Sequence, residues 1–304
     1  MPLSDNGLPQ EVVTAAVSIQ HETGLCEADL IVPGKLPAEC MLMLMEKHTQ
    51  SWNPRRYIDL TLLFSGQGGA AKSARDMGMQ AMTFDKRDCK FEDIRSVVGS
   101  LLATWYVHST VVNGIVWMSP DCDPWLSFIT KSTTERNNKE PDIVGNCDSE
   151  WVQAANDVAL LVSWIIFIAY MRGIYTSIEQ PINSMLFKYP CVKITHEIVD
   201  AKRVVCFAGA LGATSPKPLE FMVTIPSEHV DLYLRHGKRE AQLRFKEEDI
   251  QPTKLAKVTQ SGWVCGTKHM AASKAYPSGL CNAIARCAHH VRSGVAYVED
   301  RNNT

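Results

Sequence analysis

Residues 58–85, IDLTLLFSGQGGAAKSARDMGMQAMTFD, have the order of a nucleotide-binding βαβ unit. The apolar run 60–64 is long enough for a buried strand and too short for a helix. The glycine-rich turn 65–69 follows, and glycines without Cβ atoms let the backbone approach a ligand closely. A helix-forming segment over 70–77 and a second apolar run over 80–84 complete the unit.

The acidic residue that ends this unit indicates a ribose-bearing ligand. Asp85 lies about twenty residues beyond the glycines, where a carboxylate can accept hydrogen bonds from both ribose hydroxyls. The turn Gly66-Gln67-Gly68-Gly69 lacks the last glycine of the dinucleotide pattern G-x-G-x-x-G. This departure favours a nucleoside without a pyrophosphate, for which S-adenosylmethionine (SAM) is the obvious candidate. We expect the three glycines to cradle its methionine end.

Length and composition predict a soluble globular protein with a sizeable core. The chain has 304 residues, of which 45% are hydrophobic and 21% charged, and a formal net charge of −2. This charge gives no general attraction to polyanions, so a nucleic-acid partner would need a local basic patch. The ten cysteines form no C-x-x-C pair and no signal peptide precedes them, which favours reduced thiols and a cytoplasmic or nuclear location.

The pattern along the chain suggests four parts. We expect an N-terminal extension over 1–50, a SAM-binding and catalytic core over 51–199, and a small recognition or lid region over 200–262. A C-terminal segment over 263–304 then returns to the core.

Three segments outside the βαβ unit carry further expectations about structure. Residues 30–32 are predicted as a strand, and the Met-rich segment 37–47 as a helix that either packs as an arm or acts as a substrate lid. The apolar run 158–171 is shorter than the roughly 18 to 20 residues of a membrane span. It therefore predicts a buried helix, capped by Asn156 or Asp157.

Polar clusters follow three predicted strands, at 65–69, 119–125 and 179–184. In an open α/β sheet, ligands bind beyond the carboxyl ends of the strands. We therefore expect the three clusters to meet at one crevice.

Two side chains in these clusters suggest chemistry. Cys122 follows a buried strand, where a thiolate could act as a nucleophile, although most cysteines are small buried hydrophobes. Its neighbours Asp121 and Asp123 would raise its pKa and oppose thiolate formation. Glu179 ends an apolar strand, where burial can raise the pKa of a carboxyl group so that it donates a proton. It could equally satisfy the amides of its loop.

The segment Asp123-Pro124-Trp125 allows a different chemistry. The acid could accept the hydrogens of an amino group while the indole ring stacks on a flat substrate. Metal binding has little support, because the histidines are not spaced for a shared site and no C-x-x-C pair exists.

Together these motifs resemble the cytosine-C5 DNA methyltransferase family. LLFSGQGG is similar to its first SAM motif, SPDCDPWLS to its nucleophile loop P-C-Q-P-F-S, and IEQPINSMLF to its E-N-V/E-N-P motif. The resemblance implies that Cys122 is the catalytic cysteine and that Glu179 engages the cytosine ring. It also implies that Asp93 and Ile94 hold the adenine of SAM and that the segment 275–277 returns to the cofactor site. The E-Q-P, S-P-K-P-L and A-Y-P versions of the motifs look like a divergent algal and protist branch.

We therefore predict a SAM-dependent methyltransferase of α/β class, with a Rossmann-like class I methyltransferase sheet, helices on both faces and a small C-terminal appendage. The predicted cofactor-binding residues are Phe64, Ser65, Gly66, Gly68, Gly69, Asp85, Asp93, Ile94 and Pro120. The predicted catalytic residues are Cys122, Asp123 and Glu179, and the predicted substrate-binding residues are Trp125, Gln180, Pro181 and Asn183.

The sequence leaves the methyl acceptor open. If it is a cytosine, Cys122 attacks C6 and Glu179 steadies N3. If it is a small molecule or an exocyclic amine, Asp123, Trp125 and Glu179 orient it and the methyl group is displaced directly. A third alternative is a protein that binds SAM or nucleic acid without catalysis, because a fold does not imply a function. Membrane association is not expected, and the oligomeric state and the role of residues 1–50 are not determined.

Overall fold

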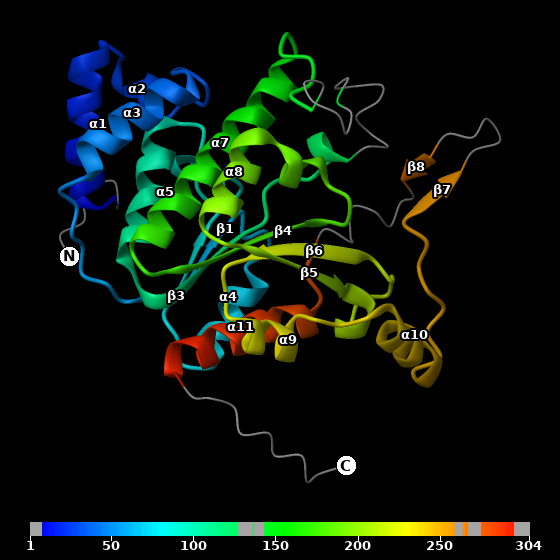
Figure 1. The fold of residues 1–304 in the computed structure, drawn as a ribbon. Helices are drawn as coiled ribbons and strands as arrows, with labels where there is room; N and C mark the ends of the chain where they lie inside the picture. Colours follow the sequence, from blue (N-terminus) through cyan, green and yellow to red (C-terminus); the bar gives the residue numbers. More distant parts are fainter. Residues whose placement is uncertain (1–7, 127–135, 137–142, 259–263, 267–274, 295–304) are drawn as a thin grey trace.

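The computed structural model describes residues 8–126, 136, 143–258, 264–266 and 275–294, and at its centre is a six-stranded sheet (Figure 1). In spatial order the strands are β2 (Ala81–Phe84), β1 (Ile58–Leu63), β3 (Thr110–Met118), β4 (Tyr175–Pro181), β6 (Pro218–Val223) and β5 (Lys202–Phe207). The first four pair in parallel, whereas β6 runs antiparallel to both of its neighbours. The fold is therefore α/β with a mixed, mostly parallel sheet, compatible with a Rossmann-like fold.

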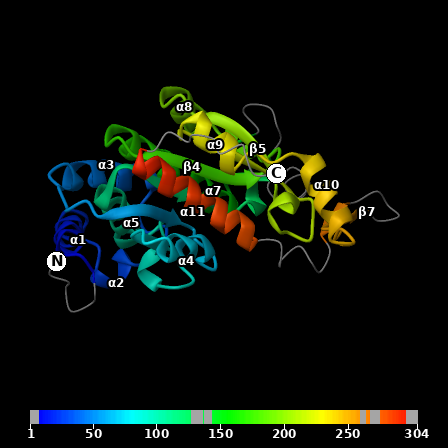
Figure 2. The same cartoon turned by 90° about the horizontal axis from the view of Figure 1, so that it is seen from below.

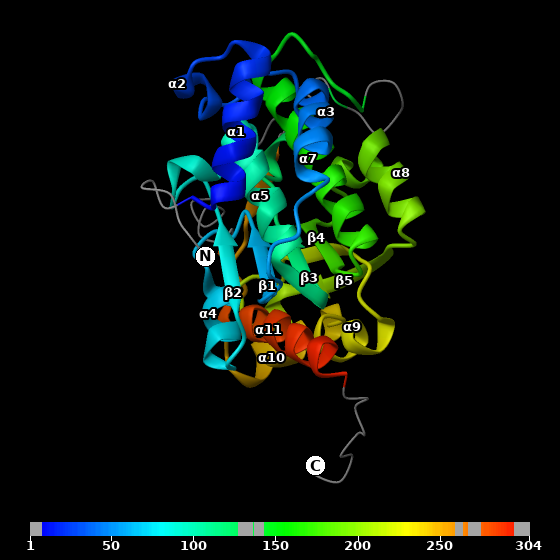
Figure 3. The same cartoon turned by 90° about the vertical axis from the view of Figure 1, so that its left-hand side faces the viewer.

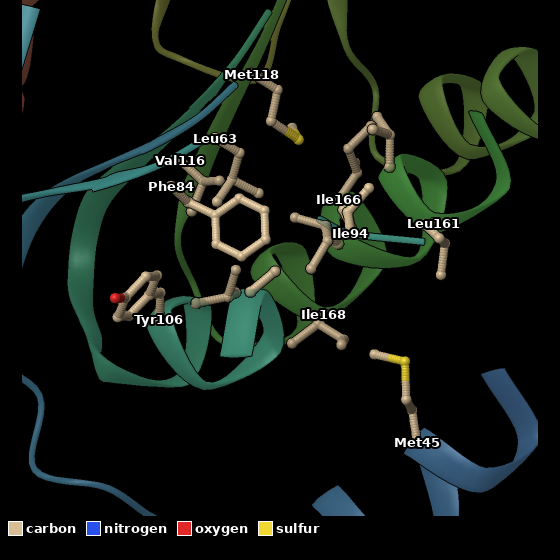
Figure 4. Close-up of a cluster of buried hydrophobic side chains, with 14 of the residues drawn as sticks. Met45, Leu63, Phe84, Ile94, Tyr106, Val116, Met118, Leu161, Ile166 and Ile168 are labelled. Atoms are coloured by element: carbon tan, nitrogen blue, oxygen red, sulfur yellow. The ribbon is translucent and has the colours of Figure 1, made fainter. Parts of the chain in front are cut away.

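Helices cover both faces of the sheet and give a three-layer structure (Figure 2). One face is covered by α5 (Val97–Ser109) and α7 (Glu150–Met171), and the other by α4 (Gly69–Asp76), α9 (Ser227–Tyr233) and α11 (Ser278–Ser293). Side chains of β3 contribute to both hydrophobic cores, because successive side chains of a strand point to opposite faces of the sheet. Val116 and Met118 join the α5–α7 core, part of which is drawn in Figure 4, while Ile115 and Trp117 join the α4–α11 core.

The N-terminal extension forms an outer layer over α5. It consists of α1 (Gln10–Thr23), α2 (Glu27–Leu30) and α3 (Ala38–Thr49), which lie beside α5 and α7 in Figure 3. Every residue of α5 is buried, as expected for a helix that is apolar on all sides, and this burial requires the outer layer. The extension is therefore part of the core.

Two expectations for this extension have different outcomes. The strand predicted over 30–32 is wrong, because Leu30 ends α2 and a turn follows, and α1 was not predicted at all. The helix predicted over 37–47 is confirmed as α3. Its Met41 and Met45 are buried in the α5–α7 core while Met43 is exposed, so this helix packs as an arm.

The long apolar helix α7 begins earlier than the sequence suggested. Its first residue is Glu150, so Asn156 and Asp157 lie inside the helix and the predicted caps are wrong. Asn156 instead serves the preceding loop, because its Nδ2 donates to the Val144 carbonyl at 3.2 Å. By length and composition α7 is long and apolar enough to cross a membrane, and half of its most apolar window is buried inside the fold.

The sheet and its helices do not end at the boundary expected at residue 199. β5 and β6 complete the central sheet, although both fall in the expected recognition region over 200–262. Before these two strands comes α8 (Pro190–Ile198), and after them come α10 (Lys238–Glu247) and the small hairpin of β7 (Ala256–Val258) and β8 (Val264–Gly266). After this hairpin the chain returns to the core, where α11 packs against α4, β1 and β3.

The close approach of α4 and α11 can be tested at Gly69. A Cβ atom added at Gly69 would lie 2.7 Å from Cys281 Sγ on α11, which is too close for two non-bonded atoms. We expect Gly69→Ala to lower the free energy of unfolding by about 1–3 kcal/mol in urea denaturation. Cys281→Ala removes the sulfur, so the double variant should lose clearly less than the sum of the two single losses. Additive losses would contradict this packing.

Candidate functional site

A cavity of about 630 Å³ lies at the carboxyl ends of the four parallel strands. Its wall contains residues of all three polar clusters, namely 65–67 with 69, 119–122 with 124–125, and 179 with 181. The three clusters therefore meet at one crevice, as expected. Most of the predicted site residues line this cavity, but four do not: Gly68, Asp123, Gln180 and Asn183.

The glycine turn has the backbone geometry that its sequence indicates. Gly66 and Gly68 have φ angles of 60° and 66°, in the left-handed region that glycine adopts without steric cost. Gly68 immediately precedes α4, and Gly69 is the first residue of that helix. Phe64 also has a positive φ, 59°, which is uncommon for a large residue and marks backbone strain at the end of β1.

Asp85 fastens this turn to the end of β2. Its side chain is 5% exposed and accepts hydrogen bonds from Gly66 N at 2.9 Å and from Arg87 N, Nε and Nη2 at 2.8–3.0 Å. Burial raises the pKa of Asp85, but the hydrogen bonds from Arg87 and Gly66 outweigh it and the net shift is downward. The carboxylate is therefore ionised, and the largely exposed Arg87 side chain covers it.

The cavity wall beyond Asp85 contains the residues that the resemblance assigns to adenine. Ile94 is buried, and the Asp93 carboxylate accepts a hydrogen bond from Arg95 N at 3.0 Å. Glu92, which the sequence analysis did not single out, also lines the cavity and accepts a hydrogen bond from Asp85 N at 2.7 Å. Burial raises the pKa of Glu92, whereas the hydrogen bonds to Asp85 lower the pKa of that residue.

Cys122 reaches the cavity as a neutral thiol. Burial raises its pKa to about 12, and the nearby carboxylates of Asp123, Glu179 and Asp121 act in the same direction. Lys217 is the group that opposes this shift. The thiol donates a hydrogen bond to Asp123 Oδ1, 3.9 Å from Sγ.

The same loop offers ligand atoms to a metal ion, which the sequence analysis did not expect. The carboxylates of Asp121 and Asp123 and the Cys122 sulfur each have an atom within 4.8 Å of the others. Exposed acids often lie this close without binding an ion.

Trp125 is held by the protein itself. Its side chain is 1% exposed, the Arg136 guanidinium lies 4.0 Å from its ring centroid, and Tyr189 approaches edge-on at 5.2 Å. Arg136 in turn donates to the Ile143 carbonyl and to Asn156 Oδ1, both at 2.8 Å. Trp125 lines the cavity, but one ring face is taken by Arg136, so the predicted stacking on a substrate is not available on that face.

Gln180 and Asn183 have structural roles. Gln180 is 1% exposed; its Nε2 donates to the Pro120 carbonyl at 2.7 Å and its Oε1 accepts from Ser184 Oγ at 2.9 Å. It thereby ties the loop after β3 to the loop after β4. Asn183 is exposed at a φ of 65°, a backbone conformation that asparagine tolerates better than most residues. Neither residue lines the cavity, and their role in substrate binding stays a prediction.

Glu179 is the centre of a buried hydrogen-bond network that the sequence analysis did not predict. It is 8% exposed, and its Oε2 accepts a hydrogen bond from the Tyr276 hydroxyl at 3.1 Å. Tyr276 also contacts Trp117 Nε1 at 3.2 Å and Ser119 Oγ. Burial raises the pKa of Glu179, while Lys217 and the Tyr276 hydrogen bond oppose that shift. The only sequence signal for Tyr276 was the Ala-Tyr-Pro motif before the closing helix.

Comparisons with known proteins identify no relative. No protein-family model matches the chain, and no curated protein matches it significantly. The geometry of the cavity and the chemistry of its side chains therefore carry the functional argument.

The neutral state of Cys122 can be measured by alkylation. We expect iodoacetamide to label the exposed Cys40 rapidly at pH 7.5 and Cys122 slowly, with the Cys122 rate still rising above pH 10, because its pKa is about 12 and only the thiolate reacts. Peptide mass spectrometry gives both rates from one sample. Labelling of Cys122 as fast as Cys40 at neutral pH would mean that the site activates its thiol.

Proposed function

We propose that the protein is a class I SAM-dependent methyltransferase. The observation that carries this proposal is the cavity that joins the glycine turn after β1, the acid after β2, the Cys122 loop after β3, and Glu179 near the end of β4. A ligand-binding crevice at the carboxyl ends of parallel strands is general for open α/β sheets. The cavity volume of about 630 Å³ is in the range of small-molecule and cofactor sites.

The cofactor half of the cavity suits a nucleoside that lacks phosphates. Gly66 presents backbone without a side chain, and Asp85 supplies an ionised carboxylate for two hydroxyl groups. The Arg87 guanidinium pairs with that carboxylate, but the Arg87 side chain is 65% exposed. Ribose hydroxyls can therefore displace the guanidinium and bind the carboxylate. Asp93 and Ile94 then face the adenine. SAM supplies an electrophilic methyl group when it is bound there.

The acceptor half supports a nitrogen-containing ring beside Glu179. A carboxyl group with a raised pKa keeps its proton to a higher pH than an ordinary glutamic acid and can donate it to a ring nitrogen. Cys122 lines the same cavity, which fits the resemblance to the cytosine-C5 enzymes. In that reaction Asp123 would accept the thiol proton and Cys122 Sγ would bond to C6 of cytosine while Glu179 gives its proton to N3, which shifts electron density to C5. C5 would then take the methyl group that SAM supplies, and loss of the C5 proton to solvent with cleavage of the S–C6 bond would restore the ring and release Cys122. The base has to be flipped out of a duplex or presented in a single strand.

Direct transfer to a small molecule or an exocyclic amine is the alternative. It is favoured by the pKa of about 12 for Cys122, since at neutral pH only about one thiol in 10⁵ would be ionised. In that reaction Glu179 orients the acceptor and Cys122 is only part of the wall. A protein that binds SAM without transfer is the third alternative.

SAM binding can be tested by calorimetry with three variants. We expect wild-type protein to bind SAM with a Kd in the micromolar range, as is common for cofactors and substrates. Asp85→Asn should weaken binding at least tenfold, because the amide loses the charge and one acceptor. Arg87→Ala should bind as well as wild type or better, because it uncovers the carboxylate. Asp88→Asn, at an exposed acid three residues away, is the control. Equal affinity of all four proteins would place SAM elsewhere.

The route of transfer is decided by Cys122. With labelled SAM and a single strand that contains cytosine, we expect Cys122→Ala to lower turnover at least about a thousandfold, as when an essential nucleophile is removed. Glu179→Gln should lower it by about 10²–10⁴, the range for a lost general acid. A strand without cytosine is the control. Unchanged transfer by Cys122→Ala would establish direct displacement. SAM binding without transfer to any strand or metabolite would support the third alternative, a protein that binds SAM without catalysis.

A further inference from the structure

Tyr276 joins the C-terminal segment to the acceptor side of the cavity. It lies two residues before α11, yet its hydroxyl contacts Trp117 of β3, Ser119 just beyond that strand, and Glu179 of β4. Tyr276 is partly buried, and desolvation of its phenol raises the pKa well above the usual value. The hydroxyl is therefore neutral and has one proton to donate and two lone pairs to offer.

The donors in this network fix the direction of its hydrogen bonds. The Trp117 indole N–H can only donate, so it donates to the Tyr276 oxygen. If Tyr276 donates to Glu179 Oε2, Ser119 can donate to the second lone pair of Tyr276, and all three hydrogens are used. If Tyr276 donated to Ser119 instead, the Ser119 hydroxyl would have no acceptor among the described residues. The first arrangement gives every donor of this partly buried network an acceptor within the network, as is usual where polar groups are shielded from water.

This direction gives the two oxygens of Glu179 different roles. Oε2 accepts the Tyr276 hydrogen, so a proton held by Glu179 belongs on Oε1. Among the described residues no side chain donates a hydrogen bond to Oε1, and Glu179 lines the cavity. Oε1 is therefore the oxygen of Glu179 that is available to a methyl acceptor bound in the cavity.

The charged and titratable groups around Glu179 come from four parts of the chain. They are Tyr276 of the C-terminal segment, Lys217 before β6, Cys122 after β3, and Cys206 on β5. Lys217 and Tyr276 both favour the carboxylate, and burial favours the protonated acid and prevails. The two thiols have raised pKa values and are neutral near pH 7. Tyr276 is the only one of these groups with a hydrogen bond to Glu179 among the described residues.

We propose that Tyr276 is a positioning residue that holds Glu179 Oε2 as an acceptor and so presents the Glu179 proton on Oε1 to the methyl acceptor. The arrangement of the proton follows from the network alone. Its catalytic consequence rests on the proposed methyl transfer.

The first test measures the proton on Glu179 without any substrate. Infrared spectra of protein labelled with ¹³C-glutamate, minus those of Glu179→Gln, report the protonated carboxyl group as the pH is raised. Tyr276→Phe removes a hydrogen bond that stabilises the carboxylate, so we expect the midpoint to move up by about one pH unit. Tyr175→Phe, at the start of the same strand and outside the cavity, should leave it unchanged.

The sign of the shift decides between the two arrangements. A downward shift in Tyr276→Phe would mean that Glu179 donates from Oε2 to Tyr276, and no shift would mean that the bond is absent; either result overturns the proposal. If Tyr276→Phe fails to fold, 3-fluorotyrosine at position 276 replaces it. A fluorinated phenol is a stronger donor, so the midpoint should then move down, and an upward or absent shift would overturn the proposal.

The second test measures turnover. We expect Tyr276→Phe to lower kcat about 10- to 100-fold with little change in KM for the acceptor, and to move the alkaline limb of the pH profile upward with the infrared midpoint. A lower kcat with an unmoved limb would reduce Tyr276 to a packing role and overturn the proposal. An infrared shift without methyl transfer from wild-type protein would refute the proposed function and leave the assignment of the proton intact.

Discussion

The carboxylate of Asp85 is the contact on which the arrangement of the site depends. It binds the amide of Gly66 and thereby sets the position of the glycine turn relative to the end of β2. The turn leads directly into α4, whose Gly69 meets Cys281 of α11, and the segment before α11 carries Tyr276 to Glu179. The Asp85 side and the Glu179 side of the cavity are therefore connected through one series of contacts that crosses the α4–α11 layer.

The two central carboxyl groups are shifted in opposite directions. Asp85 is buried but receives several hydrogen bonds from Arg87 and Gly66, so its pKa falls. Glu179 is buried with one hydrogen bond from Tyr276 and one nearby cation, so its pKa rises. An ionised acid suits hydroxyl groups, and a protonated acid suits a ring nitrogen. Separated pKa values are the usual way in which one site assigns different tasks to similar groups.

The strands and their meeting point could be predicted from the sequence because both depend on local signals. Short apolar runs followed by polar turns mark β1, β3 and β4, and parallel strands bring those turns together. The roles of Trp125 and Gln180 could not be predicted from the sequence. Residue spacing does not reveal that Arg136 covers the Trp125 ring or that Gln180 donates to the Pro120 carbonyl. Tyr276 was missed as a partner of Glu179 because 97 residues separate the two. Asn156 was predicted as a helix cap because the sequence does not reveal that its hydrogen-bond partner lies in the loop before α7.

The position of α11 near the end of the described chain has a consequence for synthesis. The ribosome releases all six strands before α11, so the sheet face that α11 covers stays partly bare until residues 278–293 emerge. β4 likewise keeps an open edge until β6 arrives, since β6 is its neighbour in the sheet and follows β5 in the chain. Exposed apolar faces and open strand edges invite association between nascent chains. α11, the last helix among the described residues, therefore acts as a closing element of folding, and the Glu179 side of the cavity is complete only when it docks.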